Sequence, residues 1–327
     1  MKAIVFTEYG PPDVLHLKDV PQPLPKDDEV LIKIFATTAT LYDCWVRNST
    51  APAGFGLISR IEAGFNTPKQ PILGTELAGE IEATGKDVTL FKNGDQVFGF
   101  SAQLGTYAEY ICLPESAVGL KPISMNYEEA ASVPQGALTA LHFLRKGNVK
   151  LGDKVLIFGA SGGVGGYAVQ LAKHYFGAEV TGVCSTSKIE YVKSLGACQV
   201  IDYTKEDFSK KGQTYDVIFD TVGKSSIFRS RRSLKKTGSY LFATFGLPKL
   251  FPILWLNLTS KQKAIMGLVE ASSEDLFSIK ELIDAGKMKA IIDKSFPLEQ
   301  AAEAHRYVET GQKTGQVVIT IDHEGKT

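Results

Sequence analysis

The stretch that most constrains this chain is GASGGVGG at residues 159–166, where five of the eight residues are glycine. It directly follows KVLIF and directly precedes YAVQLAKHYF. Glycine inside structured chain costs conformational entropy, so such a cluster indicates a backbone that turns tightly or approaches another group closely. A strand, a glycine turn and a helix in this order leave free N–H groups at a helix N-terminus, which favours phosphate binding.

The sequence around this turn alternates between apolar strands and helices. The strands EVTGVC, QVIDY, YDVIFDTV and SYLFATF are nearly continuous in apolar character, and a helix is also expected over residues 226–236. Such strands between helices are typical of a parallel sheet covered on both faces. We therefore predict a Rossmann-type, doubly wound α/β domain over residues 123–269. A complete strand–turn–helix–strand unit favours dinucleotide binding over a merely tight turn.

The remainder of the chain has a different pattern. Residues 1–122 contain short β-rich runs such as EVLIKIFAT and DQVFGF, separated by Gly, Pro, Asp and Asn. This pattern predicts a compact β-rich unit. After about residue 270 come two amphipathic helices and the strands AIIDKSF and GQVVITID. We expect these strands to return to the first unit and complete it. A chain of 327 residues is also long enough for two domains.

The charge balance gives no indication of a nucleic-acid or polyanion partner. Lys plus Arg and Asp plus Glu both number 36, so the formal net charge is zero. Neutrality argues against nucleic-acid binding and leaves little repulsion against a homodimer. The basic run FRSRRSLKK at residues 228–236 is therefore interpreted as a solvated helix face rather than a nucleic-acid patch.

Targeting and metal signals are weak. The four cysteines form no Cys-x-x-Cys pair and the five histidines are scattered, which predicts free thiols, a reducing cytoplasmic location and no metal site. The N-terminus does not resemble a secretory signal. The longest apolar run, LFPILWLNL at residues 250–258, is too short to span a membrane. We expect it to form a buried loop; the alternatives are a pocket wall or a subunit interface.

The end of the second strand indicates which dinucleotide binds. NAD-preferring sites carry Asp or Glu there, whereas this chain has VCSTSK at residues 183–188. Ser185 and Thr186 can donate hydrogen bonds, Lys188 adds positive charge, and Tyr203 on the next strand could also reach an additional phosphate. The alternative is that Ser185 caps a helix and Lys188 is solvated. We predict NADPH (NADP) as the cofactor.

Several segments in series resemble the medium-chain dehydrogenase/reductase superfamily. They are PILGTELAGEIEATG, ASVPQGALTALHFL, GDKVLIFGA, GASGGVGGYAVQLAK, SLGACQVIDY, YDVIFDTVG and TGQVVI. The resemblance is greatest to the zinc-free quinone oxidoreductase (zeta-crystallin-like) branch. It implies a GroES-like catalytic domain formed by residues 1–122 and 270–327. It also implies cofactor contacts from Thr139, Ala160, Ser161, Gly162, Gly163, Val164, Val222, Phe245 and Gly246.

Two threonines support the zinc-free assignment. Thr40 and Thr75 stand where the zinc alcohol dehydrogenases have Cys and His, and neutral hydroxyls are poor zinc ligands. The branch usually reads V-N-P-x-D where this chain has ATLYD at residues 39–43. Thr40 and Tyr42 are the candidate catalytic residues beside the acceptor, with core packing as the alternative for Tyr42. Asp43 and Arg47, four residues apart, predict a structural ion pair.

The chemistry expected without a metal is hydride delivery to an already activated acceptor. Quinones and α,β-unsaturated carbonyls qualify, because their oxygen accepts the developing negative charge. The sequence therefore predicts a small-molecule quinone or enone reductase. One alternative is an NADPH-binding structural or regulatory protein with little turnover. Another is an alcohol dehydrogenase-like activity.

Overall fold

A parallel sheet and a largely antiparallel sheet organise the chain, and each belongs to its own unit. The computed structural model describes residues 1–51, 53–244, 246–267, 269 and 272–323. Unit 1 contains residues 1–51, 56–135 and 270–327, and unit 2 contains residues 52–55 and 136–269.

Unit 2 has the predicted Rossmann-type architecture. Its six parallel strands lie in the order β10-β9-β8-β11-β12-β13. They are β8 (Lys154–Phe158), β9 (Glu179–Cys184), β10 (Gln199–Asp202), β11 (Tyr215–Asp220), β12 (Leu234–Phe242) and β13 (Lys263–Met266). The chain order reverses beside β8, the strand that leads into the glycine turn. Ligands of doubly wound sheets bind at such a switch point.

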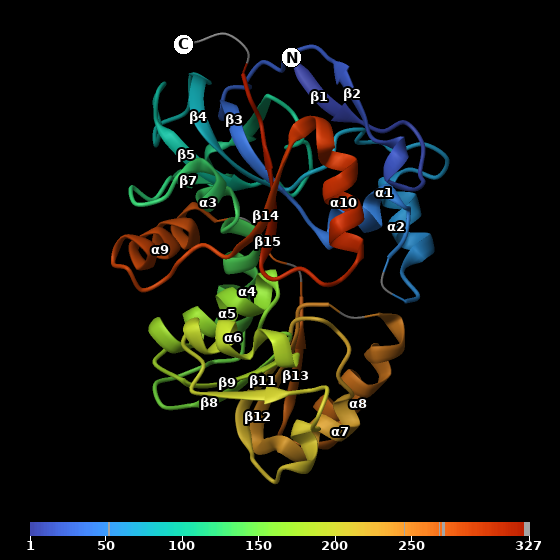
Figure 1. Cartoon of the computed structure of the whole chain (residues 1–327), viewed down its shortest axis with the longest axis vertical. Helices are drawn as coiled ribbons and strands as arrows, with labels where there is room; N and C mark the ends of the chain where they lie inside the picture. Colours follow the sequence, from blue (N-terminus) through green and yellow to red (C-terminus); the bar gives the residue numbers. More distant parts are fainter. Residues whose placement is uncertain (52, 245, 268, 270–271, 324–327) are drawn as a thin grey trace. The chain divides into compact units, whose positions relative to one another are not determined.

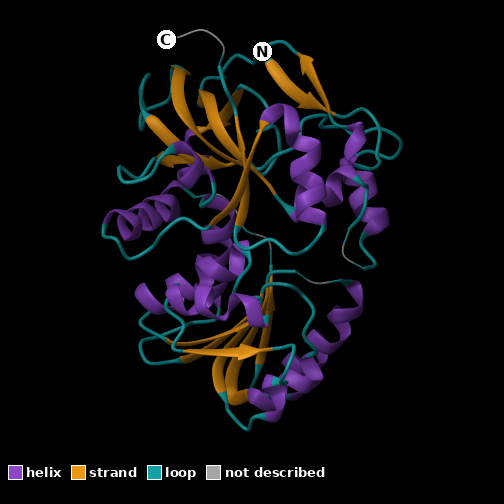
Figure 2. Cartoon of the chain, viewed as in Figure 1, coloured by secondary structure: helices purple, strands orange, loops and turns teal. Residues whose placement is uncertain are grey.

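Helices cover both faces of this sheet, with α5 and α6 on one side and α7 and α8 on the other (Figure 1; strands orange and helices purple in Figure 2). The helices are α4 (Pro134–Lys146), α5 (Gly163–His174), α6 (Ile189–Ser194), α7 (Ile227–Ser230) and α8 (Leu250–Thr259). Buried side chains from the strands and from α8 form one hydrophobic cluster, which includes Leu156, Ile218 and Leu256. Covering both faces explains why the strands are apolar throughout.

The expected helix over residues 226–236 is wrong in its second half. Helix α7 ends at Ser230, and β12 begins at Leu234, which pairs with Tyr215 of β11. Leu234 is buried in the core of unit 2, while the two lysines that follow it are exposed. Burial of this leucine in the sheet therefore outweighs the helical preference of the basic residues around it.

The expectation that LFPILWLNL is buried is also wrong. This run forms α8, which tolerates Pro252 because the proline lies in the first helical turn. Ile253 and Leu256 are buried, but Phe251, Leu254 and Leu258 are 73%, 57% and 84% exposed. The run is therefore a half-buried helix with an apolar outer side.

Unit 1 is built on a seven-stranded sheet in which β14-β15-β3-β4-β5-β7 are neighbours and β6 pairs with β3. Its strands are β3 (Glu29–Ala39), β4 (Glu76–Thr84), β5 (Gln96–Phe100), β6 (Tyr110–Pro114), β7 (Val118–Leu120), β14 (Ile292–Pro297) and β15 (Gln316–Thr320). Strand β15 pairs antiparallel with β3, so the last part of the chain joins the sheet begun by the first, as expected. A separate hairpin pairs β1 (Lys2–Val5) with β2 (His16–Asp19).

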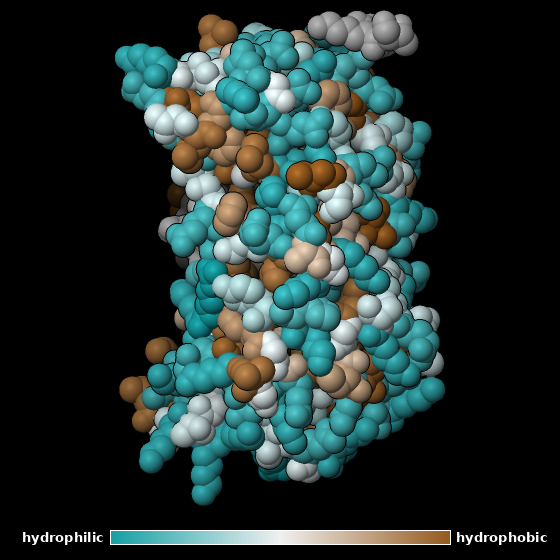
Figure 3. Space-filling view, turned by 90° about the vertical axis from the view of Figure 1, so that its left-hand side faces the viewer, coloured by the Kyte–Doolittle hydropathy of each residue, from teal (hydrophilic) through white to brown (hydrophobic). Residues whose placement is uncertain are grey.

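The helices of unit 1 are α1 (Leu41–Arg47), α2 (Gly56–Ala63), α3 (Tyr127–Ala131), α9 (Ser273–Asp284) and α10 (Ala301–Glu309). One face of α10 packs into the main core of the unit, together with β3 and β15. Within the described part of the chain, no helix combines the length and apolar character needed to cross a membrane. On the face drawn in Figure 3, hydrophobic residues lie scattered among hydrophilic ones, as on most protein surfaces.

Candidate functional site

The glycine turn between β8 and α5 is closed by contacts that leave no room for side chains. Gly159 has φ of +84°, and a Cβ there would lie 2.2 Å from Cγ2 of Val222. A Cβ on Gly165 would lie 2.0 Å from the carbonyl oxygen of Gly159. The first turn of α5 therefore packs directly against the backbone that leaves β8. These two glycines are required by the protein's own packing, whether or not a ligand is bound.

The start of α5 presents donors and open space. Gly162 is the N-cap, and the helical hydrogen bonds begin with the 2.8 Å bond from Gly166 N–H to its carbonyl. The N–H groups of Gly163, Val164 and Gly165 precede that bond and have no partner within the helix. A Cβ on Gly162 would meet no protein atom closer than 3.5 Å. This helix terminus is suited to an anion such as a phosphate.

Hydrogen bonds anchor the turn to the neighbouring strand. The N–H groups of Gly159 and Ala160 both donate to the carbonyl of Val183 on β9, each at 3.1 Å. Ala160 is fully buried, whereas Ser161, Gly162, Gly163 and Val164 are half-buried. The residues predicted to contact the phosphates thus lie just beyond the carboxyl end of β8, on a turn that is hydrogen-bonded to β9.

Strand register brings together the residues predicted to bind the additional phosphate of NADPH. Cys184 at the end of β9 pairs with Asp202 at the end of β10, so Ser185 and Tyr203 follow at the same edge of the sheet. The Tyr203 side chain is 57% exposed, and its N–H donates to the Cys184 carbonyl at 3.1 Å. Ser185 stands at the N-cap position of the 3-10 helix Thr186–Lys188, but its side chain makes no capping hydrogen bond, so the alternative interpretation of Ser185 as a side-chain cap is wrong.

The sequence prediction missed an acidic residue beside this group. Asp202 accepts hydrogen bonds from the hydroxyls of Thr186 and Thr204, and Lys205 lies 3.7 Å from its carboxylate. The hydrogen bonds from these two threonines lower the pKa of Asp202 to about 2, so it is ionised at neutral pH. The Thr186 hydroxyl is thereby engaged with a carboxylate. Among the residues predicted to bind the additional phosphate, Ser185 and Tyr203 are therefore better candidates than Thr186.

The DTVG turn after β11 is organised by Asp220, which the sequence prediction did not single out. This buried carboxylate accepts hydrogen bonds from the N–H groups of Val222 and Gly223 at 3.0 and 2.7 Å, and from Ser225. Val222 is 42% exposed and packs against the glycine turn. An aspartate that ends a buried strand before T-V-G was the available signal, because such residues close Asx turns.

The structure describes three of the other four predicted cofactor contacts. Lys188 is half-buried and ends the 3-10 helix Thr186–Lys188 that follows β9. Thr139 is half-buried on α4. Gly246 lies against Ala53, because a Cβ on Gly246 would come within 2.6 Å of the Ala53 carbonyl oxygen. Phe245 lies outside the described residues. All described cofactor candidates belong to unit 2, and both catalytic candidates belong to unit 1.

Thr40 forms the N-terminal cap of α1. Its hydroxyl donates to Asp43 at 2.6 Å, and the Asp43 carboxylate also accepts from the N–H groups of Thr40 and Gly74 at 2.8 and 2.9 Å. Burial raises the pKa of Asp43 to about 6, and these hydrogen bonds limit the increase. The Tyr42 ring on the same helix is 44% exposed, so it does not pack in the core.

The expected ion pair between Asp43 and Arg47 is wrong, because each has another partner. The fully buried Arg47 side chain pairs with Glu309 of α10 and donates from Nε to the Gly10 carbonyl at 3.0 Å. Arg47 also contacts Nδ1 of the buried His305 at 3.0 Å. Partners separated by 258 residues or more in sequence cannot be found from helix spacing.

His305 is at the centre of a buried polar network in unit 1. Burial, together with the positive charge of Arg47, lowers the pKa of His305 to about 3, so the ring is neutral. Because arginine can only donate, Nδ1 accepts from Arg47. The ring proton then lies on Nε2, which donates to the Tyr107 hydroxyl at 3.0 Å. The network links α1 to α10.

Glu76 and Thr75 occupy the buried start of β4. The carboxylate of Glu76 accepts from the Thr38 hydroxyl and from the N–H of Gln135 at 2.7 Å, and burial raises its pKa to about 7. The Thr75 hydroxyl is buried, with no hydrogen-bond partner among the described residues. Within that part of the chain, no three His, Cys, Asp or Glu side chains are grouped as a metal site would require.

The raised pKa of Glu76 predicts a pH-dependent stability. The unfolded chain ionises near the ordinary value of 4.5, whereas the folded chain keeps the proton to about pH 7. The contribution of Glu76 is thus fully present below pH 4.5 and is lost as pH rises to 7. We expect wild type to lose on the order of 3 kcal/mol relative to Glu76→Gln over this interval. Urea unfolding of both proteins at pH 4.5 and 7.5 measures it; a constant difference between them would contradict the assignment.

Known proteins are similar to this chain over nearly its whole length. The profile described as alcohol dehydrogenase GroES-like domain matches residues 26–123, and that described as zinc-binding dehydrogenase matches residues 195–319. A 2-methylene-furan-3-one reductase of Solanum lycopersicum is 34% identical over 98% of this chain and 79% of its own length. An NADPH-dependent alkenal/one oxidoreductase of Arabidopsis thaliana is 31% identical with the same coverage.

Solved structures agree with these sequence matches. The quinone oxidoreductase of Coxiella burnetii superposes with a TM-score of 0.87 at 32% identity, covering 98% of this chain and 99% of that one. A coverage of 98% means that the similarity includes residues of both units.

Proposed function

Because the chain belongs to the medium-chain dehydrogenase/reductase superfamily, in its quinone oxidoreductase branch, we propose that it is an NADPH-dependent, zinc-independent reductase of quinones or α,β-unsaturated carbonyls. The observation that carries this proposal is the turn from Gly159 to Gly165. Its backbone is closed by packing, and the helix terminus after it offers unpaired N–H groups with open space in front.

The residues of unit 2 fit a dinucleotide with an additional phosphate. The N–H groups of Gly163 and Val164 would hold the pyrophosphate at the start of α5. Ser185 and Tyr203, directly after β9 and β10, and Lys188, which ends the 3-10 helix after β9, would hold the 2′-phosphate through hydroxyl and ammonium donors. When bound, the cofactor supplies a hydride. Asp202 does not argue for NADH, because its carboxylate already accepts hydrogen bonds from Thr186 and Thr204.

The acceptor class is proposed from the relatives. The names of the tomato and Arabidopsis proteins specify a methylene-furanone and alkenals or alkenones. These are α,β-unsaturated carbonyls, and quinones share their conjugated C=C–C=O unit. In either case a donor near the carbonyl oxygen stabilises the negative charge that develops there. Tyr42 is the better candidate for this donor, since its ring is exposed while the Thr40 hydroxyl donates to Asp43.

Zinc independence is proposed from the chemistry of the two threonines. Zinc ligands in proteins are thiolates, imidazoles and carboxylates, and neutral hydroxyls replace two of them here. The Thr40 hydroxyl is moreover committed to Asp43 as a helix cap. We also propose that the protein acts as a homodimer, since its zero net charge gives no long-range repulsion between copies.

An acceptor screen tests this proposal. The purified protein, treated with a chelator, is mixed with NADPH or NADH and with p-quinones, 2-alkenals or simple alcohols, and absorbance at 340 nm is followed. We expect oxidation of NADPH by quinones or alkenals. Tight binding of NADPH with no acceptor reduced would indicate a binding protein instead. Zinc-dependent alcohol oxidation would indicate an alcohol dehydrogenase.

Gly162 separates a ligand requirement from a folding requirement. An alanine at this position fits the protein, since φ is −85° and the nearest atom is 3.5 Å from the Cβ. The added methyl group would stand where the phosphate approaches. We therefore expect Gly162→Ala to raise the Kd for NADPH about tenfold, or roughly 1.4 kcal/mol, with an unchanged Tm. Fluorescence titration and thermal unfolding measure the two quantities. If Gly162→Ala binds NADPH as tightly as wild type, the phosphate does not lie beside Gly162.

A further inference from the structure

A segment of unit 2 has a charge composition that the proposed reductase activity does not use. Residues 221–269 contain nine lysines and arginines and no aspartate or glutamate, although the whole chain is neutral. Lys235 and Lys249 pair with aspartates of β11. Arg232, Lys236 and Lys261 are exposed and form no ion pair with any carboxylate that the structure describes. This part of unit 2 therefore presents excess positive charge to solvent.

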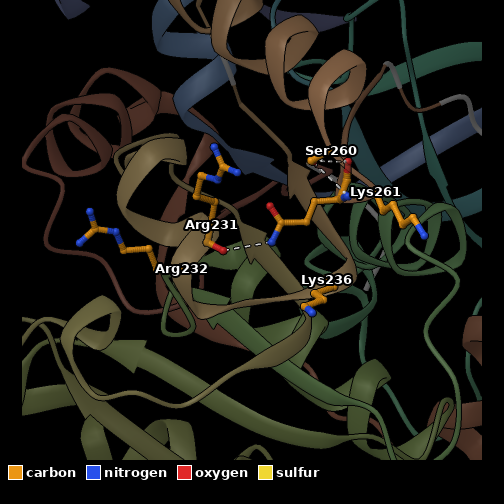
Figure 4. A pocket seen from close by; sticks show the side chains of 6 residues that line it. Arg231, Arg232, Lys236, Ser260 and Lys261 are labelled. Atoms are coloured by element: carbon orange, nitrogen blue, oxygen red, sulfur yellow. Dashed lines mark hydrogen bonds between the residues drawn. The ribbon is translucent and has the colours of Figure 1, made fainter.

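The basic residues are spread over a surface instead of enclosing one small site. Arg231, Arg232, Lys236 and Lys261 line a depression beside the end of α8, and their charged groups point apart (Figure 4). Gln262 fixes the backbone beneath them, donating from Nε2 to the carbonyls of Arg231 and Leu234 at 3.1 and 3.0 Å. Divergent cations on a fixed backbone fit an extended negative surface better than a single anion.

An apolar stripe lies next to these cations. Phe251, Leu254 and Leu258 have the i, i+3, i+7 spacing of one helix side, and all three are more than half exposed. Ile253 and Leu256 fill the core on the opposite side of α8. An exposed stripe of large apolar side chains is unfavourable in water and marks a surface that binds something.

Trp255 connects the stripe to the cations. Its ring lies 5.6 Å from the Phe228 ring of α7, and the Arg231 guanidinium is 4.9 Å from the centre of the Trp255 ring. Helices α7 and α8 accordingly lie side by side (Figure 1). We call the stripe, Trp255 and the exposed cations Arg232, Lys236 and Lys261 the α8 surface.

We propose that the α8 surface binds the surface of an anionic lipid bilayer. A helix with large apolar residues on one side and cations beside them lies in the headgroup region, with its apolar side chains inserted. The cations would meet the negative headgroups, each Lys or Arg contributing about 1 kcal/mol near such a surface. A nucleic acid would use stacked aromatic side chains, whereas two of the three stripe residues are leucines. A second copy would bring like charges together.

Vesicle co-sedimentation tests the proposal with the full-length protein. The vesicles contain phosphatidylcholine alone, or phosphatidylcholine with 30% phosphatidylserine. We expect binding to the anionic vesicles, little binding to the neutral ones, and a marked decrease in 0.5 M NaCl because salt screens exposed charges. Equal binding to both vesicle types, or no binding to either, would overturn the proposal.

Two variants test whether the α8 surface is responsible for vesicle binding. Arg232→Gln/Lys236→Gln/Lys261→Gln should lower the partition coefficient about 100-fold, since each charge contributes roughly a factor of five. Phe251→Ser/Leu258→Ser should lower it about tenfold or more. Each matched control removes the same number of positive charges, or of large exposed apolar side chains, from positions outside the α8 surface. The controls should bind the anionic vesicles as wild type does. They are Lys18→Gln/Lys92→Gln/Lys287→Gln and Ile123→Ser/Leu151→Ser.

Two further measurements identify the competing occupants. Equilibrium sedimentation of Phe251→Ser/Leu258→Ser reports self-association, and anisotropy of a labelled oligonucleotide reports nucleic-acid binding. A loss of dimer in this variant without any vesicle binding by wild type would assign the stripe to a second copy and overturn the proposal. Oligonucleotide binding that exceeds vesicle binding would also overturn it. Unchanged NADPH oxidation by all variants is expected, because the α8 surface is separate from the proposed reductase residues.

Discussion

Gly165→Ala is expected to destabilise unit 2 and to abolish NADPH binding. The new Cβ would lie 2.0 Å from the Gly159 carbonyl oxygen. The backbone alone fixes the positions of both atoms. No side-chain rotation relieves that contact, so α5 must move away from β8. Overpacking of this kind costs about 3 kcal/mol, and in a unit of this size it lowers Tm by about 6–12 °C. The same movement would displace the N–H groups that are proposed to hold the pyrophosphate.

Thermal unfolding and NADPH titration of the purified variant measure these effects. Gly162→Ala is the matched control, because its Cβ would meet no atom within 3.4 Å and its φ suits alanine. The control should keep the wild-type Tm even though it binds NADPH less tightly. A Gly165→Ala protein with wild-type Tm and affinity would show that the turn is looser than described.

Lys188→Ala combined with Tyr203→Phe is expected to remove the preference for NADPH. Both residues follow strands that end at the same edge of the sheet, and they would donate to the 2′-phosphate. A hydrogen bond to a charged group contributes about 1.5–3 kcal/mol, so the Kd for NADPH should increase at least 100-fold. NADH lacks this phosphate, and its Kd should stay within about twofold.

Lys193→Ala is the control for this double variant. Lys193 is exposed on α6, a few residues beyond Lys188, and pairs with Glu190 at 2.8 Å. Lys193→Ala removes one positive charge close to Lys188 in the sequence. The affinities of this variant for both cofactors should equal those of wild type. Equal losses of NADPH and NADH affinity in the double variant would mean that Lys188 and Tyr203 stabilise the fold, or bind the adenosine that both cofactors share, instead of binding the 2′-phosphate.

The sequence was sufficient wherever the signal was local. The glycine turn, the apolar strand before it and the helix after it are consecutive, and each has a distinctive composition. The alternation of strands and helices also determined the class of unit 2, since a parallel sheet covered on both faces needs apolar strands throughout. The family resemblance rested on segments of this kind.

The sequence was insufficient wherever a side chain meets a distant partner. Asp202 contacts Thr186 only because β9 and β10 are in register, so this acidic neighbour cannot be found from residues 183–188 alone. The spacing of Asp43 and Arg47 suggested a helical ion pair, but Gly74 and Glu309 supply the stronger partners. The apolar composition of residues 250–258 predicted burial, although a helix on the surface of a unit can bury only one side.

The central claim is that the chain transfers a hydride from NADPH to a conjugated carbonyl without zinc. The most direct measurement uses NADPH deuterated at C4 on either face, metal-depleted protein and a 2-alkenal or p-quinone, with mass spectrometry of the products. For the alkenal, we predict one deuterium at the β-carbon of the saturated product, from only one of the two labelled cofactors. A reduced product that is unlabelled with both deuterated cofactors, or turnover that requires added zinc, would contradict the claim.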